Sequence, residues 1–242
     1  MRLDKFLVES GLGSRSQVKQ LLKKGQVWVN GTAVTSAKTQ IDEQSDQIVV
    51  DGQTLVYEKF VYYLLNKPKG VISATEDDRH KTVLDLLDDA ARQKEVFPVG
   101  RLDVDTHGLL LLTNNGQLSH AMLSPKRHVA KVYQAQVAGL MDQADVERFA
   151  QGIELKDFTC QPAQLEIIER NEGAQTSLVR ITLSEGKFHQ VKRMVLACGK
   201  EVTDLQRLSM GHLQLDPSLE LGQWRRLTKE EMQSLEIFQV EL

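Results

Sequence analysis

The sequence predicts an α+β protein made of two unequal units, and three observations support this prediction. The chain has 242 residues, more than the roughly 150 residues of an average domain. Its first 60 residues show the pattern of two short helices and a β-hairpin, whereas the remainder is rich in short apolar runs typical of strands. Strands and helices do not alternate regularly, which argues against a doubly wound parallel sheet. We place the units at residues 1–59 and 60–242.

The first unit contains clear signals for the ends of its elements. Apolar side chains at 3–7 have helical spacing. Ser14 followed by Gln17 predicts a capping box at the start of a second helix. The dipeptide Asn30-Gly31, which follows alternating apolar residues, predicts a tight hairpin turn. A unit of this size has a small core, which suits binding better than catalysis.

Cations of the first unit are arranged for contact with a polyanion. Three of them are four residues apart along the second predicted helix, so they lie in one row on its exposed face. We expect this row and one arginine near the N-terminus to bind RNA backbone; these residues are Arg2, Arg15, Lys19 and Lys23.

The distribution of charge is more informative than its total. The formal net charge is −3, which taken alone argues against a polyanion-binding protein. However, residues 1–24 carry +4, residues 106–141 carry +3 and residues 186–212 carry +3, so the rest of the chain carries −13. Any one basic segment could be an ordinary solvated surface. Three on an acidic background indicate a nucleic-acid-binding face.

The second unit is predicted from its apolar runs. An apolar run at 60–65 leads into a turn-forming loop with two cations, Lys67 and Lys69. Leu109–Leu112 has the composition of a buried strand, and the following Asn114-Asn115-Gly116 predicts that it enters a hairpin. The other predicted strands are 132–137, 164–168 and 178–183, and the predicted helices are 82–87, 142–151 and 190–198.

The segment GRLDVDTHGLLLLT at 100–113 is the densest group of chemically useful residues. It places Asp103 and Asp105 in a polar loop directly before the buried strand, where a rigid scaffold can carry a functional carboxylate. Asp103 could instead simply pair with Arg101. The two aspartates could also be the paired carboxylates of a glycosidase, although a separation of two residues does not establish the required geometry.

Several segments resemble known families. RLDKFL and SRSQVKQLLKKGQVWVNG in the first unit resemble the αL RNA-binding domain of the ribosomal-protein-S4 type. GRLDVDTHGLLLLT closely resembles the signature of pseudouridine synthases of the RsuA branch. LNKPKGV at 65–71, AKVY at 130–133 and EGKFHQVKRM at 185–194 resemble further motifs of that family in the same order. The resemblance spans essentially the whole chain. It implies a catalytic domain built on a mainly antiparallel mixed sheet with flanking helices.

The resemblance also implies an activity and its residues. The expected reaction is the isomerisation of uridine to pseudouridine in RNA by extrusion of the target base, without a cofactor or metal. Asp103 is the implied catalytic carboxylate, Tyr133 would stack on the uracil, and Lys192 would be the cation beside the carboxylate. The remaining expected RNA contacts are Arg101, Lys67, Lys126, Arg127 and Arg193.

The final motif suggests the substrate. Other branches of the superfamily carry arginine where this chain has Lys192 in HQVKRM, which resembles the branch that modifies small-subunit (16S) ribosomal RNA. We therefore expect a monomeric, cytoplasmic, bacterial enzyme that acts on ribosomal RNA, within a small-subunit assembly intermediate. Neither a signal peptide nor a membrane span is expected. Two alternatives are the same chemistry on large-subunit ribosomal RNA and a non-catalytic ribosome-assembly factor. The second is disfavoured because Asp103, Tyr133 and Lys192 are all present.

Overall fold

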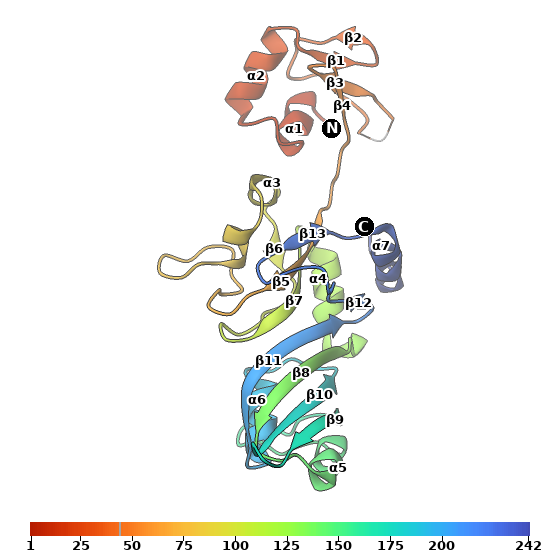
Figure 1. The fold of residues 1–242 in the computed structure, drawn as a ribbon. Helices are drawn as coiled ribbons and strands as arrows, with labels where there is room; N and C mark the ends of the chain where they lie inside the picture. The colour runs from red at the N-terminus through yellow and green to blue at the C-terminus, as the bar shows by residue number, and fades with distance from the viewer. Residues whose placement is uncertain (44) are drawn as a thin grey trace. The chain divides into compact units, whose positions relative to one another are not determined.

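The computed structural model describes residues 1–43 and 45–242, and the chain divides into two compact units (Figure 1). The first unit comprises residues 1–61 and 88–95, and the second comprises residues 62–87 and 96–242. The segment 88–95 thus belongs to the first unit, although its sequence position lies within the range that we assigned to the second. No helix in the described part of the chain is long and apolar enough to span a membrane.

The first unit packs helices against a small antiparallel sheet. Its strands have the order β2-β1-β3-β4, so the predicted hairpin is present but is extended by a second one. The capping box between Ser14 and Gln17 is formed, and Asn30 and Gly31 have the positive φ angles (48° and 77°) that the tight turn requires. The elements are α1 (Leu3–Glu9), α2 (Arg15–Lys23), β1 (Val27–Val29), β2 (Thr32–Ala33), β3 (Ile48–Val50), β4 (Gln53–Leu55) and α3 (Asp89–Gln93).

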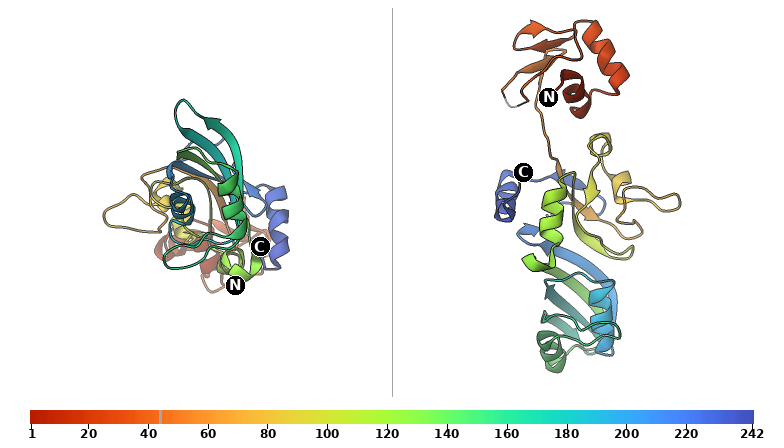
Figure 2. Two further views of the ribbon diagram at one scale, coloured as in Figure 1. Left: turned by 90° about the horizontal axis from the view of Figure 1, so that it is seen from below. Right: turned by 180° about the vertical axis from the view of Figure 1, so that it is seen from behind.

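The second unit is built on one mixed sheet with the strand order β13-β5-β7-β11-β8-β10-β9. The strands are β5 (Tyr62–Lys67), β6 (Phe97–Pro98), β7 (His107–Thr113), β8 (Lys131–Ala138), β9 (Gln164–Asn171), β10 (Thr176–Leu183), β11 (Glu201–Met210), β12 (Leu213–Gln214) and β13 (Trp224–Arg226). The α-helices are α4 (Gly116–Leu123), α5 (Gln143–Gln151), α6 (Gln190–Ala197) and α7 (Lys229–Leu235), and 3₁₀ turns cover Val83–Leu86, Pro125–Arg127 and Glu236–Phe238. Helix α6 packs against β11, and α5 packs against β9 (Figures 1 and 2).

The predicted mixed, mainly antiparallel sheet is confirmed, but one local prediction is wrong. Leu109–Leu112 lies in the buried strand β7, as expected. It does not enter a hairpin. Instead, the side chain of Asn115 accepts a hydrogen bond from the backbone N–H of Leu118 at 3.1 Å and caps helix α4. Asn115 has φ −87°, so the turn geometry that an asparagine–glycine pair can supply is not used here.

The two halves of the sheet meet at the parallel pair β7–β11, directly after the loop that carries Asp103. Strand β7 pairs with β11 through His107–Gln206 and Gly108–Arg207 only. Gly108 has φ +105°, and a Cβ at this position would overlap with the backbone of Arg207. A side chain is therefore excluded for two independent reasons, backbone conformation and close approach. The polar loop 100–106 ends at this junction.

Candidate active site

A buried lysine holds the loop that carries Asp103. Lys67, at the end of β5, is fully buried, and its Nζ donates hydrogen bonds to the carbonyl oxygens of Pro68, Asp103 and Thr106 at 3.0, 3.0 and 2.9 Å. Burial lowers its pKa to about 8, against the attraction of Asp103 and Asp105. The RNA contact that we predicted for Lys67 is therefore wrong, because its ammonium points into the protein and all three protons are used.

Three further hydrogen bonds connect the same loop to the segment that follows β5. Ser73 Oγ donates to the carbonyl of Leu102 at 2.9 Å and accepts from the Leu102 N–H at 3.0 Å. The N–H of Gly70 donates to the carbonyl of Val104 at 2.7 Å. The motif LNKPKGV, together with Ser73 just after it, therefore holds GRLDVD in place, which explains physically why both segments occur in one site.

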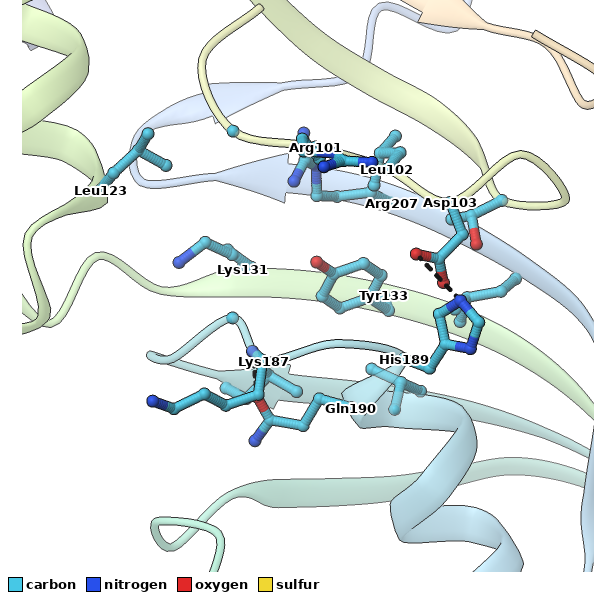
Figure 3. Close-up of a pocket in the computed structure, with 16 residues that line it drawn as sticks. Arg101, Leu102, Asp103, Leu123, Lys131, Tyr133, Lys187, His189, Gln190 and Arg207 are labelled. Carbon is cyan, nitrogen blue, oxygen red and sulfur yellow. Dashed lines mark hydrogen bonds and ion pairs between the residues drawn. The ribbon is translucent and has the colours of Figure 1, made fainter. Parts of the chain in front are cut away.

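Asp103 lies beside Lys192, 89 residues away in sequence. Lys192 Nζ donates to Asp103 Oδ2 at 3.1 Å and to Asp105 Oδ1 at 2.5 Å. His189 Nε2 lies 3.6 Å from Asp103 Oδ1 (Figure 3). Burial lowers the pKa of Lys192, but the hydrogen bonds to Asp105 and Asp103 outweigh it and raise the pKa overall. The hydrogen bond from Lys192 lowers the pKa of Asp105.

Tyr133 forms the floor of the site on strand β8. It is 8% exposed and pairs across the sheet with Arg207 on β11, so both side chains lie on the same face. Figure 3 shows Tyr133 between the Asp103 loop and the segment that begins α6. An inner pocket of about 130 Å³ is lined by Asp103, Tyr133 and Arg207 among others. It adjoins an outer cavity of about 830 Å³, which is within the size range of ligand sites.

The other predicted RNA contacts are dispersed. Arg101 lines both cavities. Lys126 and Arg127 are exposed in a 3₁₀ turn, and Arg127 Nη2 donates to the carbonyl of Phe238 at 3.5 Å. Arg193 forms an ion pair with Asp157. In the first unit all four predicted cations are exposed, and one of them is ion-paired with Asp4; they are Arg2, Arg15, Lys19 and Lys23.

The site contains residues that we did not predict. Arg207 and Lys131 line the inner pocket, and Phe188, which is 75% exposed, stacks on His189 with ring centroids 3.8 Å apart. Alternation along β11 carries a usable signal for Arg207, because Leu205, two residues earlier, occupies the same buried face. No periodicity marks His189, whose φ of 50° places it in the left-handed region.

The fold and the site together define an enzyme with a carboxylate at the mouth of a cation-lined pocket, joined to a small nucleic-acid-binding domain. Residues 61–197 match the family model of RNA pseudouridylate synthase, and residues 1–48 match the S4 domain. The chain therefore belongs to the RNA pseudouridylate synthase family, whose members isomerise uridine in RNA to pseudouridine, and it carries an N-terminal S4 domain.

Relatives match over nearly the full length. The chain is 44% identical to the uncharacterized RNA pseudouridine synthase YtzG of Bacillus subtilis, over 97% of this chain and 98% of that protein. It is 41% identical to ribosomal small subunit pseudouridine synthase A of Vibrio cholerae (97% and 99% covered) and 38% identical to ribosomal large subunit pseudouridine synthase B of B. subtilis (97% and 95% covered). A crystal structure of a pseudouridylate synthase superposes with a TM-score of 0.67 at 37% identity, covering 97% of this chain and 99% of that one.

Proposed function

We propose that this enzyme isomerises a specific uridine of small-subunit ribosomal RNA, with Asp103 as the catalytic carboxylate. The observation that carries the proposal is the Asp103–Lys192 pair at the mouth of a pocket floored by Tyr133. Names of the relatives favour ribosomal RNA but divide between the two subunits. Lys192 in HQVKRM favours the small subunit, as the sequence resemblance implies. The cytoplasm, where ribosomes assemble, is the corresponding location.

We assign each side chain a task that its position supports. Lys192 orients the Asp103 carboxylate, since its ammonium donates a charge-assisted hydrogen bond directly to Oδ2. The aromatic face of Tyr133 offers a surface on which an extruded uracil can stack. Arg101, which lines the cavities beside Asp103, is placed to contact the RNA backbone or the vacated base stack. The carboxylate then attacks the ribose or the base, or removes the C2′ proton.

The deciding experiment incubates the wild-type protein and two variants with unmodified 16S ribosomal RNA and with small-subunit assembly particles. Pseudouridine is mapped by carbodiimide-dependent primer extension. We expect product from the wild type and none from Asp103→Asn, at equal RNA affinity. Asp105→Asn, two residues away, is the matched charge change; it should still give product, because Asp105 is 64% exposed and lies outside the inner pocket.

The same assay distinguishes the alternatives. Equal signals from wild type and Asp103→Asn would refute the role given to Asp103. Product on 23S but not on 16S ribosomal RNA would assign the enzyme to the large subunit instead. If only the assembly particles are modified, a bound ribosomal protein contributes to recognition. Sedimentation of the enzyme during the assay tests the expected monomeric state.

A further inference from the structure

Two buried cations on the sheet face of the inner pocket have no carboxylate partner within the described part of the chain. Arg207 is 2% exposed, and its Nε donates to the carbonyl of Leu109 at 2.8 Å, whereas Nη2 has no partner among the described residues. Lys131 is 8% exposed, and its Nζ donates to the carbonyl of Val129 at 3.1 Å. Because buried charges are normally paired, this arrangement indicates that a ligand supplies the missing acceptor.

Both cations line the pocket in which we place the uracil. Arg207 lies opposite Tyr133 in the sheet register, and Lys131 lies two residues before Tyr133 on the same face of β8. All three line the inner pocket with Asp103 (Figure 3). A base that stacks on Tyr133 therefore shares the pocket with two cationic side chains.

The neighbouring acids do not neutralise these cations. Lys192 is bound to both Asp103 and Asp105. Glu185 attracts Lys131, but its Oε1 already accepts from Gln190 Nε2 at 2.5 Å and from the N–H of Gln161 at 2.8 Å. Arg207 and Lys131 also repel each other, so the pocket holds an excess of positive charge.

Each route open to Asp103 creates negative charge on the uracil. If Asp103 bonds to C1′ or removes the C2′ proton, the N1–C1′ bond breaks and its electron pair stays with the uracil, spread over N1, O2 and O4. If Asp103 adds to C6, the electrons of the C5–C6 bond move towards O4. Formation of the C5–C1′ bond uses up this charge; it displaces Asp103 from C1′, or is accompanied by return of the proton to C2′. On the C6 route the N1–C1′ bond breaks before C5 bonds to C1′, and Asp103 leaves C6 afterwards. Loss of the C5 proton and protonation of N1 complete the isomerisation.

We propose that Arg207 and Lys131 bind a carbonyl oxygen of the target uracil and stabilise the negative charge that develops on it during isomerisation. Donors that are already oriented towards developing charge in a water-excluded site accelerate a reaction strongly. This inference rests on the proposed function. It adds two residues that contact the base of the target nucleotide, rather than its ribose or phosphates.

The test compares Arg207→Met and Arg207→Lys with the wild type on 16S ribosomal RNA transcripts. These contain either uridine or 5-fluorouridine. Single-turnover consumption of the target nucleotide is measured by mass spectrometry of nuclease digests, and RNA affinity by filter binding. We expect the rate of Arg207→Met to fall about 100-fold on uridine at unchanged affinity, with a smaller loss for Arg207→Lys. The loss should shrink on 5-fluorouridine, because fluorine itself stabilises the charge.

Arg180→Met is the control, since Arg180 lies on β10 in the same sheet, is exposed and pairs with Glu166 outside the pocket. Its rates should match the wild type. If Arg207→Met does not fold, Lys131→Met provides the same comparison from the other cation. Affinity weakened more than 10-fold at an unchanged rate would show that the ligand is a backbone phosphate, and would overturn the inference. An equal loss on both bases would also overturn it. A wild-type protein without product would refute the proposed function itself.

Discussion

Lys67 and Lys69 show how differently two cations of one motif can act. Lys67 is fully buried and bonds to three carbonyl oxygens, whereas Lys69 is 46% exposed on its side chain and pairs with Asp204 at 2.5 Å. A buried ammonium is disfavoured relative to its neutral form, so burial lowers its pKa. Lys67 therefore positions the Asp103 loop at an energetic cost to the folded state.

This cost predicts a pH dependence of stability. Lys67 has a pKa of about 8 in the folded protein, against 10.5 for the unperturbed side chain. Below pH 8 it is charged in both states. Between pH 8 and about 10.5 the unfolded chain binds more protons, so the free energy of unfolding rises with pH, by about 3 kcal/mol at most. Lys67→Met lacks this contribution.

Urea unfolding of the wild type and Lys67→Met at pH 7.5 and 9.5 measures the effect. The difference in free energy of unfolding should grow in favour of the wild type at the higher pH. Lys131→Met should behave alike, because burial lowers the pKa of Lys131 to about 8 as well. A difference that stays constant over this range would contradict the assignment of Lys67 as a buried cation.

At the scale of elements, the parallel contact between β7 and β11 is the narrowest join along the strand order β13-β5-β7-β11-β8-β10-β9. It consists of two residue pairs, yet it sets the position of the Asp103 loop relative to Arg207 and Tyr133. Gly108 permits this join because it has a positive φ and no side chain. The geometry of the site therefore depends on a residue that contributes no chemistry.

Gly108→Ala should destabilise the protein by at least about 2 kcal/mol, from the positive φ and from overlap with the backbone of Arg207. The measurement is urea unfolding monitored by circular dichroism. Gly116→Ala is the matched control, since Gly116 begins helix α4 and a Cβ added there would meet open space among the described residues. It should be neutral or stabilising by up to about 1 kcal/mol. Equal effects of both substitutions would show that the β7–β11 join is not constrained in this way.

Sequence patterns predict elements well where the signal is local, and less well where packing decides. Most predicted strands and helices of the second unit are present, because each has its own apolar periodicity. The segment after β7 has the composition of a hairpin turn but caps a helix. Its residues suit both outcomes, and the packing of α4 selects between them.

For the whole molecule, the placement of charge matters more than the total of −3. The N-terminal basic segment presents a row of exposed cations on α2. The central and C-terminal basic segments surround the pocket and contribute both buried and exposed cations. The acidic remainder limits binding of RNA elsewhere on the surface.

If the α2 row binds RNA backbone, replacing it should weaken the dependence of binding on salt. For the triple variant Arg15→Gln, Lys19→Gln and Lys23→Gln, the slope of log K against log salt concentration should decrease in magnitude by up to about 2. Filter binding to 16S ribosomal RNA at several salt concentrations measures it. A control with equal charge removal replaces Lys156, Arg170 and Arg180, which are exposed in the second unit. An unchanged slope for the α2 variant would remove this row from the RNA-binding surface.

The sequence alone was sufficient for the fold class, the order of the motifs and the family, because these depend on local patterns and on residue identity. It also named Asp103, Tyr133 and Lys192, through resemblance rather than through spacing. Only the tertiary structure showed that Lys67 faces inwards and that Arg207 completes the pocket. The physical reason is that burial and pairing of a charge depend on the register between strands far apart in the chain. That register is set by the packing of the whole sheet.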